Sequence, residues 1–190
     1  MSAIRIGLAM TGSFCTFDSC LSAMEALKGS YDFTGLMSET AYTTDTRFGS
    51  AEHQRQRLQA LCEGKAILHT IPEAEPIGPK NYFDLLFIAP CTGNTLSRMA
   101  AGLTDGCVTM AAKSHLRGGK PVLLALSSND ALSGSARSLG TLLGRRNIYF
   151  LPFYQDDPLH KPYSLVSDYC RTEEAIRAAL DQRQLQPILA

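Results

Sequence analysis

The stretch Phe87-Ile-Ala-Pro-Cys-Thr-Gly-Asn-Thr-Leu96 decides how this chain folds. Its first half is a continuous apolar run that ends at Pro90, and small polar residues then lead into a helical pattern that starts at Asn94 or Thr95. A buried strand followed at once by a helix leaves free backbone N–H groups at the helix N-terminus, which suit an anion such as a phosphate. The segment from Pro90 to Thr95 is therefore one half of a predicted binding crevice.

A second junction of the same kind lies near the start of the chain. Residues 4–10 form an apolar strand pattern that breaks into Thr11-Gly12-Ser13. Because the carboxyl ends of neighbouring parallel strands meet at one edge of a sheet, we expect both junctions to face a single ligand. Ser38 follows the next strand, and it either adds a hydroxyl to the same phosphate or is an ordinary loop serine.

Strand patterns recur along the chain, and most are continuous apolar runs, which indicate strands covered on both faces. They span residues 4–10, 31–37, 66–71, 83–89, 121–126 and 147–151. Helical patterns lie between or after them, at residues 17–28, 49–63, 95–117, 131–144 and 164–181. The alternation predicts an α/β fold, with a doubly wound, Rossmann-like parallel sheet of six strands and helices on both faces, in one domain over residues 1–190.

Composition excludes several classes of function. Eighteen basic and eighteen acidic side chains cancel, so the sequence has no electrostatic footprint for nucleic acid or an anionic membrane. No apolar run has the length of a membrane span and no secretory signal precedes the first strand, so we expect a cytoplasmic protein. The six cysteines form no CxxC pair and have no histidine at ligand spacing, which predicts reduced thiols and no metal site.

The first junction lacks the residues that two common nucleotide-binding loops need. Gly7 to Gly12 has the glycine spacing of a triphosphate-binding loop, but Ser13-Phe14 stands where a lysine and a hydroxyl residue are required. The GxGxxG fingerprint is absent as well, so we expect no nicotinamide binding by this chain. What remains is a turn with hydroxyls that suits a monophosphate without a metal.

Three polar or nucleophilic features near these junctions each allow two interpretations. The amide of Asn94 either caps the helix or offers a donor and an acceptor to a flat heteroaromatic ring. The segment Ser127-Ser-Asn129-Asp130 brings more polar groups to the same sheet edge, where Asn129 or Asp130 would also cap the helix at 131–144. Cys91 is either a reactive thiol or, as we favour, a small packing residue.

Two proline-containing segments, residues 71–80 and 152–162, are predicted to be long loops at strand ends, and such loops are more often lids or interfaces than plain spacers. Cations near these loops and strand ends would meet an acidic substrate, unless they are only solvated surface charges. The cations in question are Arg47, Lys80, Lys113 and Lys161.

At these residues the chain resembles the flavoprotein family that includes flavin-dependent cysteine decarboxylases and flavin prenyltransferases. The matching segments run nearly end to end: 11–13, 43–49, 73–80, 89–95, 110–113, 147–150, 155–158 and 185–189. The resemblance implies a flavin mononucleotide (FMN) cofactor and assigns no catalytic side chain. The residues it places around the cofactor are Thr11, Gly12, Ser13, Ser38, Pro90, Thr92, Gly93, Asn94, Thr95, Ser127 and Asn129.

The resemblance also implies a reaction. It points to the oxidation of a dihydrodipicolinate-type precursor to dipicolinic acid, a pyridine dicarboxylate made in the mother cell of spore-forming bacteria. A second subunit would bind NAD(P), and this chain would form a homo-oligomer. Two other functions stay open: a non-catalytic partner of that subunit with a vestigial pocket, or an independent FMN-dependent decarboxylase or prenyltransferase.

Departures from the family pattern count against an independent FMN-dependent decarboxylase or prenyltransferase. Decarboxylases carry a histidine where this chain has residues 75–77, and a Pro-Ala-Met-Asn motif of which only Asn129 is kept here. Prenyltransferases place an arginine near the positions of Ser127 and Ser128, and that loop has none in this chain. Independent decarboxylation or prenyl transfer is therefore not expected.

Overall fold

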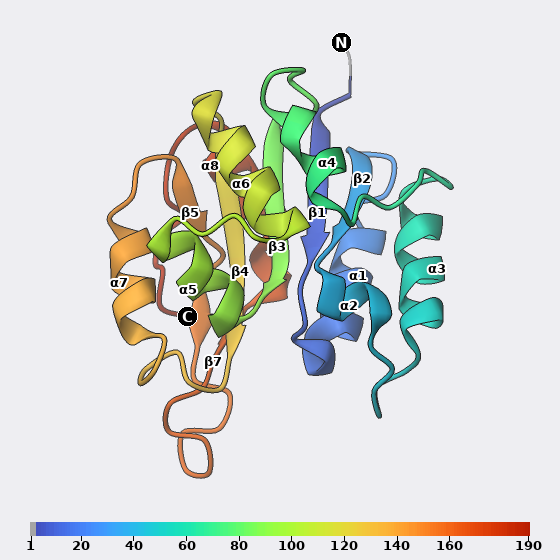
Figure 1. The fold of residues 1–190 in the computed structure, drawn as a ribbon. Helices are drawn as coiled ribbons and strands as arrows, with labels where there is room; N and C mark the ends of the chain where they lie inside the picture. The colour runs from blue at the N-terminus through green and yellow to red at the C-terminus, as the bar shows by residue number, and fades with distance from the viewer. Residues whose placement is uncertain (1–2) are drawn as a thin grey trace.

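A seven-stranded sheet forms the centre of the protein in a computed structural model that describes residues 3–190 (Figure 1). The sheet order is β2-β1-β3-β4-β7-β6, and β5 also pairs with β4. Strands β1 to β5 pair in parallel, whereas β7 runs antiparallel to β4 and β6 antiparallel to β7. Their bounds are Arg5–Met10 (β1), Asp32–Met37 (β2), Leu85–Cys91 (β3), Val122–Ser128 (β4), Ile148–Phe150 (β5), Phe153–Tyr154 (β6) and Leu165–Ser167 (β7).

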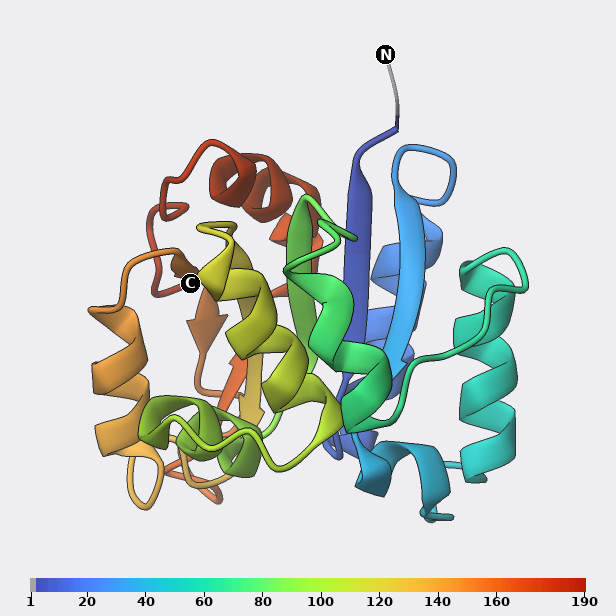
Figure 2. The ribbon, with the colours of Figure 1, turned by 45° about the horizontal axis from the view of Figure 1, so that its top comes forward.

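Helices cover both faces of this sheet, as Figure 2 shows from a second direction. Within residues 3–190 the eight α-helices are Phe17–Glu25 (α1), Glu39–Thr43 (α2), Ala51–Leu61 (α3), Ile71–Ala74 (α4), Gly93–Ala101 (α5), Cys107–Arg117 (α6), Ala136–Leu143 (α7) and Thr172–Leu180 (α8). Short 3-10 turns lie at Phe14–Thr16, Glu75–Ile77 and Tyr169–Arg171.

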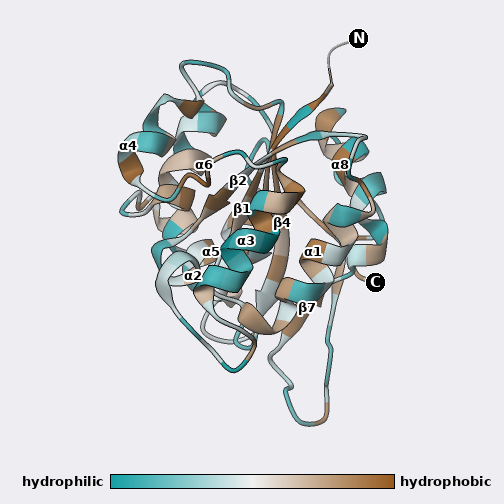
Figure 3. Ribbon diagram, turned by 90° about the vertical axis from the view of Figure 1, so that its right-hand side faces the viewer, coloured by the Kyte–Doolittle hydropathy of each residue, from teal (hydrophilic) through white to brown (hydrophobic). Residues whose placement is uncertain are grey.

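The sheet separates two hydrophobic clusters. One contains buried side chains of α1, α3 and α8, such as Phe17, Leu58 and Ile176, and the other contains those of α5 and α6, such as Leu96 and Val108. The strands between them are almost wholly apolar, whereas α3 turns a polar surface outward (Figure 3). The predicted doubly wound fold is confirmed, because strands that are apolar on both faces need cover on both sides.

Several predicted elements were wrong in detail. Residues 66–71 contribute one bridge, from Leu68 to Leu36, because Thr70 is already the N-cap of α4, which begins at Ile71. The predicted helix at 95–117 is two helices, since Gly102 adopts a left-handed conformation (φ 74°) that ends α5. The predicted helix at 164–181 begins with the strand β7, and its helical part is α8.

The segment 71–80 was also predicted wrongly, as a loop. It contains α4 and a 3-10 turn, and Pro72 and Pro76 stand in their first turns, where a missing N–H costs nothing. The carboxylate of Glu73 accepts the backbone N–H of Thr70 and so closes the start of α4.

Two kinds of feature are absent from residues 3–190. No helix there is long and apolar enough to cross a membrane. No three histidine, cysteine or carboxylate side chains gather there in a way that could hold a metal ion.

Candidate functional site

The loops after β1 and β3 are tied together at the carboxyl edge of the sheet. Buried Thr11 donates its hydroxyl to the carbonyl oxygen of Pro90 at 2.8 Å. The same hydroxyl accepts the backbone N–H of Thr92 at 3.0 Å. The Thr11 hydroxyl therefore connects the two loops by hydrogen bonds to both. Neither Thr11 nor Pro90 lines the cavities described below.

The loop after β1 is also tied to the end of β4. The Ser13 hydroxyl lies 2.9 Å from both the carbonyl oxygen and the hydroxyl oxygen of Ser127. Thr16 donates to the same Ser127 hydroxyl at 3.1 Å. Together with the bonds of Thr11, these bonds hold three segments that are distant in sequence at one edge of the sheet, as predicted for the carboxyl ends of parallel strands.

Helix α5 begins at the centre of this edge. Its N-cap is Thr92, whose hydroxyl accepts the backbone N–H of Thr95 at 3.1 Å. Asn94 therefore lies within the first turn and does not cap the helix. Its exposed amide makes no hydrogen bond to any residue from 3 to 190, so both its donor and its acceptor are available to a ligand.

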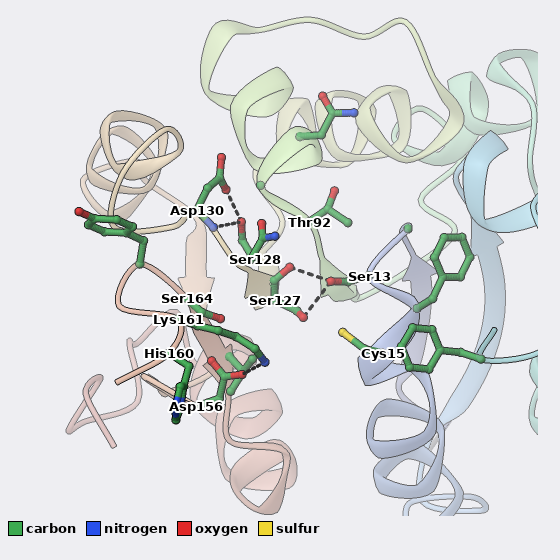
Figure 4. A pocket seen from close by; sticks show the side chains of 18 of the residues that line it. Ser13, Cys15, Thr92, Ser127, Ser128, Asp130, Asp156, His160, Lys161 and Ser164 are labelled. Atoms are coloured by element: carbon green, nitrogen blue, oxygen red, sulfur yellow. Dashed lines mark hydrogen bonds and ion pairs between the residues drawn. The ribbon is translucent and has the colours of Figure 1, made fainter. Parts of the chain in front are cut away.

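A large cavity of about 900 Å³ opens in front of these residues (Figure 4). Of the predicted site residues, the ones that line it are Gly12, Ser13, Thr92, Gly93, Asn94, Ser127 and Asn129. Its aromatic lining comes from Phe14, Phe48 and Tyr163. A cavity with aromatic walls and a few convergent polar groups is typical of sites for small organic molecules.

A small cavity of about 300 Å³ lies on the other side of Gly12, Thr92 and Asn94, which line both. Ser38 and Thr95 line only this one, together with the first residues of α6. Ser38 caps α2 by accepting the backbone N–H of Ala41 at 3.2 Å. The N-termini of α5 and α6 both border the small cavity and offer backbone N–H groups to an anion. Two carboxylates line it as well, Glu39 and Asp105, and Asp105 is paired with Arg98 at 3.1 Å.

The predicted site residues thus divide between two adjoining cavities. All of them line one or both, except Thr11 and Pro90, which hold the loops in place. The expectation that Asn129 or Asp130 caps a helix at 131–144 was wrong, because α7 begins at Ala136 with Ser135 as its N-cap. Asp130 instead accepts hydrogen bonds from the hydroxyls of Ser128 and Ser135.

Charged groups also line the large cavity. Among the four cations proposed from the sequence, Arg47 and Lys161 line it, whereas Lys80 and Lys113 do not. The Arg47 guanidinium lies 4.8 Å from the centre of the Phe48 ring, and the Lys161 ammonium is 3.2 Å from the Asp156 carboxylate. Burial opposes ionisation of Asp156, but hydrogen bonds from Ser164 and Lys161 outweigh it and lower its pKa.

Part of the wall of the large cavity comes from the loop between β6 and β7, which extends beyond the body of the molecule in Figure 1. Asp156 and His160 to Ser164 all line the large cavity. The sequence predicted a functional loop at 152–162 but not these contacts. A charged, proline-flanked segment with no helical or strand periodicity was the available signal.

Two cysteines near the site differ in environment. Cys91 is fully buried, and burial raises the pKa of its thiol to about 12, which agrees with a packing role. Cys15 is exposed and lines the large cavity, although no motif in the sequence marked it as a site residue.

Known proteins are similar to this chain in sequence or in fold. A family profile described as Flavoprotein matches residues 1–138. The B subunit of dipicolinate synthase from Bacillus subtilis (strain 168) is 40% identical over 186 residues, which cover 97% of this chain and 92% of that protein. The crystal structure of the dipicolinate synthase B subunit from Bacillus halodurans C has a TM-score of 0.89 and 40% identity, with 100% of this chain and 98% of that one covered.

A more distant structure is similar in fold alone. The FMN-dependent cysteine decarboxylase SpaF has a TM-score of 0.67 and 20% identity, and the match covers 94% of this chain and 96% of that one.

Proposed function

This chain belongs to the Flavoprotein family, and we propose that it works as the B subunit of a dipicolinate synthase. In that role it acts with an NAD(P)-binding A subunit to oxidise a dihydrodipicolinate-type precursor to dipicolinic acid. The observation that carries the proposal is the free amide of Asn94 between two adjoining cavities, one polar and one with aromatic walls. The two relatives named as the B subunit of this enzyme, each 40% identical over nearly the whole chain, support the reaction and the partner.

The residues present fit FMN. The small cavity would receive the phosphate, because the N-termini of α5 and α6 and the Ser38 hydroxyl border it. The large cavity, with its aromatic lining and about 900 Å³, would receive the ring. Asn94 lines both cavities and would hold the cofactor between its two ends. When bound, FMN supplies a two-electron redox centre beside the substrate.

The dicarboxylate would lie in the outer part of the large cavity. Arg47 offers a planar fork of donors that suits a carboxylate, and it forms no ion pair within residues 3–190. Lys161 is the second cation, and the Asp156 carboxylate positions its ammonium. Two cations in the lining of one cavity, Arg47 after α2 and Lys161 in the loop between β6 and β7, would orient a ring that carries two carboxylates, so that its hydride and proton leave from a fixed position.

The electron acceptor is assigned to the partner. The turn Thr11-Gly12-Ser13 has no dinucleotide fingerprint, so NAD(P) would be bound by the A subunit. We also propose that this chain forms a homo-oligomer and acts in the cytoplasm of the mother cell of a spore-forming bacterium.

The first experiment is a titration of the purified chain with FMN, followed by flavin fluorescence and absorbance. We expect saturable binding that Asn94→Ala weakens by at least about tenfold, since a ligand amide contact would be lost. Ser97→Ala is the matched control, because Ser97 lies one turn further along α5 and lines neither cavity. Absence of saturable binding at high micromolar FMN would overturn the cofactor assignment.

The second experiment measures turnover of the A subunit with and without this chain. The proposal requires that turnover needs both subunits and falls when Arg47→Ala or Asn94→Ala replaces the native chain. If the A subunit reaches the full rate without this chain and both variants are silent, the chain is instead a supporting partner with a vestigial pocket.

A further inference from the structure

A third cavity lies between α5 and α6, two helices that pack side by side (Figure 2). This α5–α6 cavity holds about 300 Å³. Its floor is apolar, with Met99 6% exposed and Ala112 2% exposed, and Leu116 and Leu103 form its edges. It shares no lining residue with the large cavity and only Thr109 with the small one.

Three cations surround this apolar floor. Lys113 and Arg117 stand four residues apart on α6, which places them on the same face of the helix. Arg145 follows α7 and donates to the carbonyl oxygen of Met99 at 3.3 Å, which holds its guanidinium at the edge of the cavity. No aspartate or glutamate lines the cavity, and none of the three cations forms an ion pair within residues 3–190.

This arrangement differs from that of an ordinary solvated helix face. The positive charges converge on a hollow with an apolar floor, and no carboxylate among residues 3–190 lines that hollow. A ligand that fills the hollow must therefore be apolar on one side and anionic on the other. A volume near 300 Å³ is at the lower end for small-molecule sites, so one ring with its substituents is the size that fits.

We propose that the α5–α6 cavity binds a small aromatic carboxylate. The ring would cover Met99 and Ala112, while Lys113 and Arg117 would donate to the carboxylate oxygens. Such charge-assisted hydrogen bonds are about twice as strong as neutral ones. This site goes beyond the proposed function and stands or falls without it, because neither the FMN contacts nor Arg47 belong to it.

The test uses isophthalate as the probe and the full chain labelled with ¹³C at its methionine methyl groups. The Met99 methyl lines the cavity, whereas Met10 and Met37 are fully buried elsewhere and serve as internal controls. We expect a saturable shift of the Met99 signal alone. Isophthalamide, which lacks the charge, and succinate, which lacks the ring, should each bind at least about tenfold more weakly.

Variants locate the binding groups. Replacing both cations on α6, by Lys113→Ala with Arg117→Ala, should weaken isophthalate binding at least about tenfold, while Lys80→Ala, at an exposed lysine that does not line the cavity, should leave it unchanged. The FMN titration should be unchanged in all of these variants, which separates this site from the proposed cofactor site.

Three results would overturn the proposal: no saturable Met99 shift with isophthalate, equal binding of isophthalamide or succinate, or equal binding by the double variant. Tighter binding of an oligoglutamate peptide than of isophthalate would also overturn it, and would assign the cavity to an acidic segment of a protein.

Discussion

The hydroxyl of Ser13 and the hydroxyl of Ser127 lie 2.9 Å apart, although 114 residues separate them in the chain. Ser13 follows β1 and Ser127 belongs to the end of β4, and β3 lies between these strands in the sheet. The contact therefore spans the width of the edge at which the loops of β1, β3 and β4 meet. Both side chains line the large cavity.

We expect Ser127→Ala to weaken this connection. The variant keeps the carbonyl oxygen that accepts from Ser13 but loses the hydroxyl that bonds to Ser13 and Thr16. Because Ser127 is buried, its bonding partners lose a contact that water cannot fully replace, and the free energy of unfolding should fall by about 1 kcal/mol. Urea unfolding measures this. Ser133→Ala, which removes an exposed hydroxyl, should change it by much less, and equal losses in the two variants would show that the Ser13–Ser127 contact contributes nothing of its own.

The residues that form this contact were predictable as members of one edge, but the contact itself was not. The Phe87–Leu96 stretch and the Thr11–Ser13 turn show strand ends through local apolar runs and small polar residues. Local patterns also predicted the start of α5 to within one or two residues. Which of the two cavities each residue lines depends on how the helices pack, and sequence periodicity does not report that.

The elements that the sequence did not predict are short and depend on distant partners. Strands β6 and β7 have two and three residues, too few for any periodic pattern, and they exist because β7 pairs with β4. The loop between them supplies Asp156 and Lys161 to the large cavity. Lys161 was among the cations proposed from the sequence, whereas Asp156 was missed. The sequence could not decide whether Asn94 caps α5 or binds a ligand. Asn94 and Thr92, which is the actual N-cap, are both common capping residues.

A second prediction concerns that cap. Thr92→Ala should lower the free energy of unfolding by about 1 kcal/mol, because the backbone N–H of Thr95 loses its acceptor at the start of α5. Thr92→Ser keeps the hydroxyl and should restore most of the loss. The Thr92 N–H would still donate to Thr11 in both variants, so the loop itself should persist. Chemical unfolding of the three proteins tests this, and a serine variant as unstable as the alanine variant would exclude the cap as the cause.

A third prediction is a pH dependence of stability that comes from His115. This residue is 1% exposed, and its Nε2 lies 3.1 Å from the carbonyl oxygen of Pro121. Burial lowers the pKa of this histidine from 6.5 to about 4, against the opposing effect of the Pro121 carbonyl. The folded protein therefore keeps the ring neutral at pH values where the unfolded chain takes up a proton.

The sign of the effect follows from that difference. The contribution of His115 is fully present above about pH 6.5 and is lost as the pH falls from there toward 4, because protons then favour the unfolded chain. We expect His115→Gln to be less stable than the native protein at pH 7 but to lose less stability between about pH 6.5 and 5. The exposed His53→Gln should show the native slope. Unfolding curves at several pH values test this prediction. If the free energy of unfolding of His115→Gln falls with pH as steeply as that of the native protein, His115 is not the source of this pH dependence.

The last prediction compares two glycines in helices. By helix propensity alone, alanine should be better than glycine by about 1 kcal/mol at either position. At Gly140 in α7 an added Cβ meets nothing within 4 Å, so Gly140→Ala should stabilise the protein by up to that amount. At Gly93 in α5 the same atom would lie 2.5 Å from the Ser135 hydroxyl and 2.6 Å from the Ser128 hydroxyl.

Neither hydroxyl can move away from that Cβ freely. Both donate to the Asp130 carboxylate, which itself would lie 2.7 Å from the new atom. Gly93→Ala must therefore displace α5 or break these bonds, and either should cost about 1–3 kcal/mol. Because Gly93 lines the large cavity, the same shift should weaken FMN binding. Thermal unfolding and FMN titration of both variants test this: a Gly93→Ala protein as stable as Gly140→Ala would show that the loop after β4 yields, and that the close contact does not constrain the site.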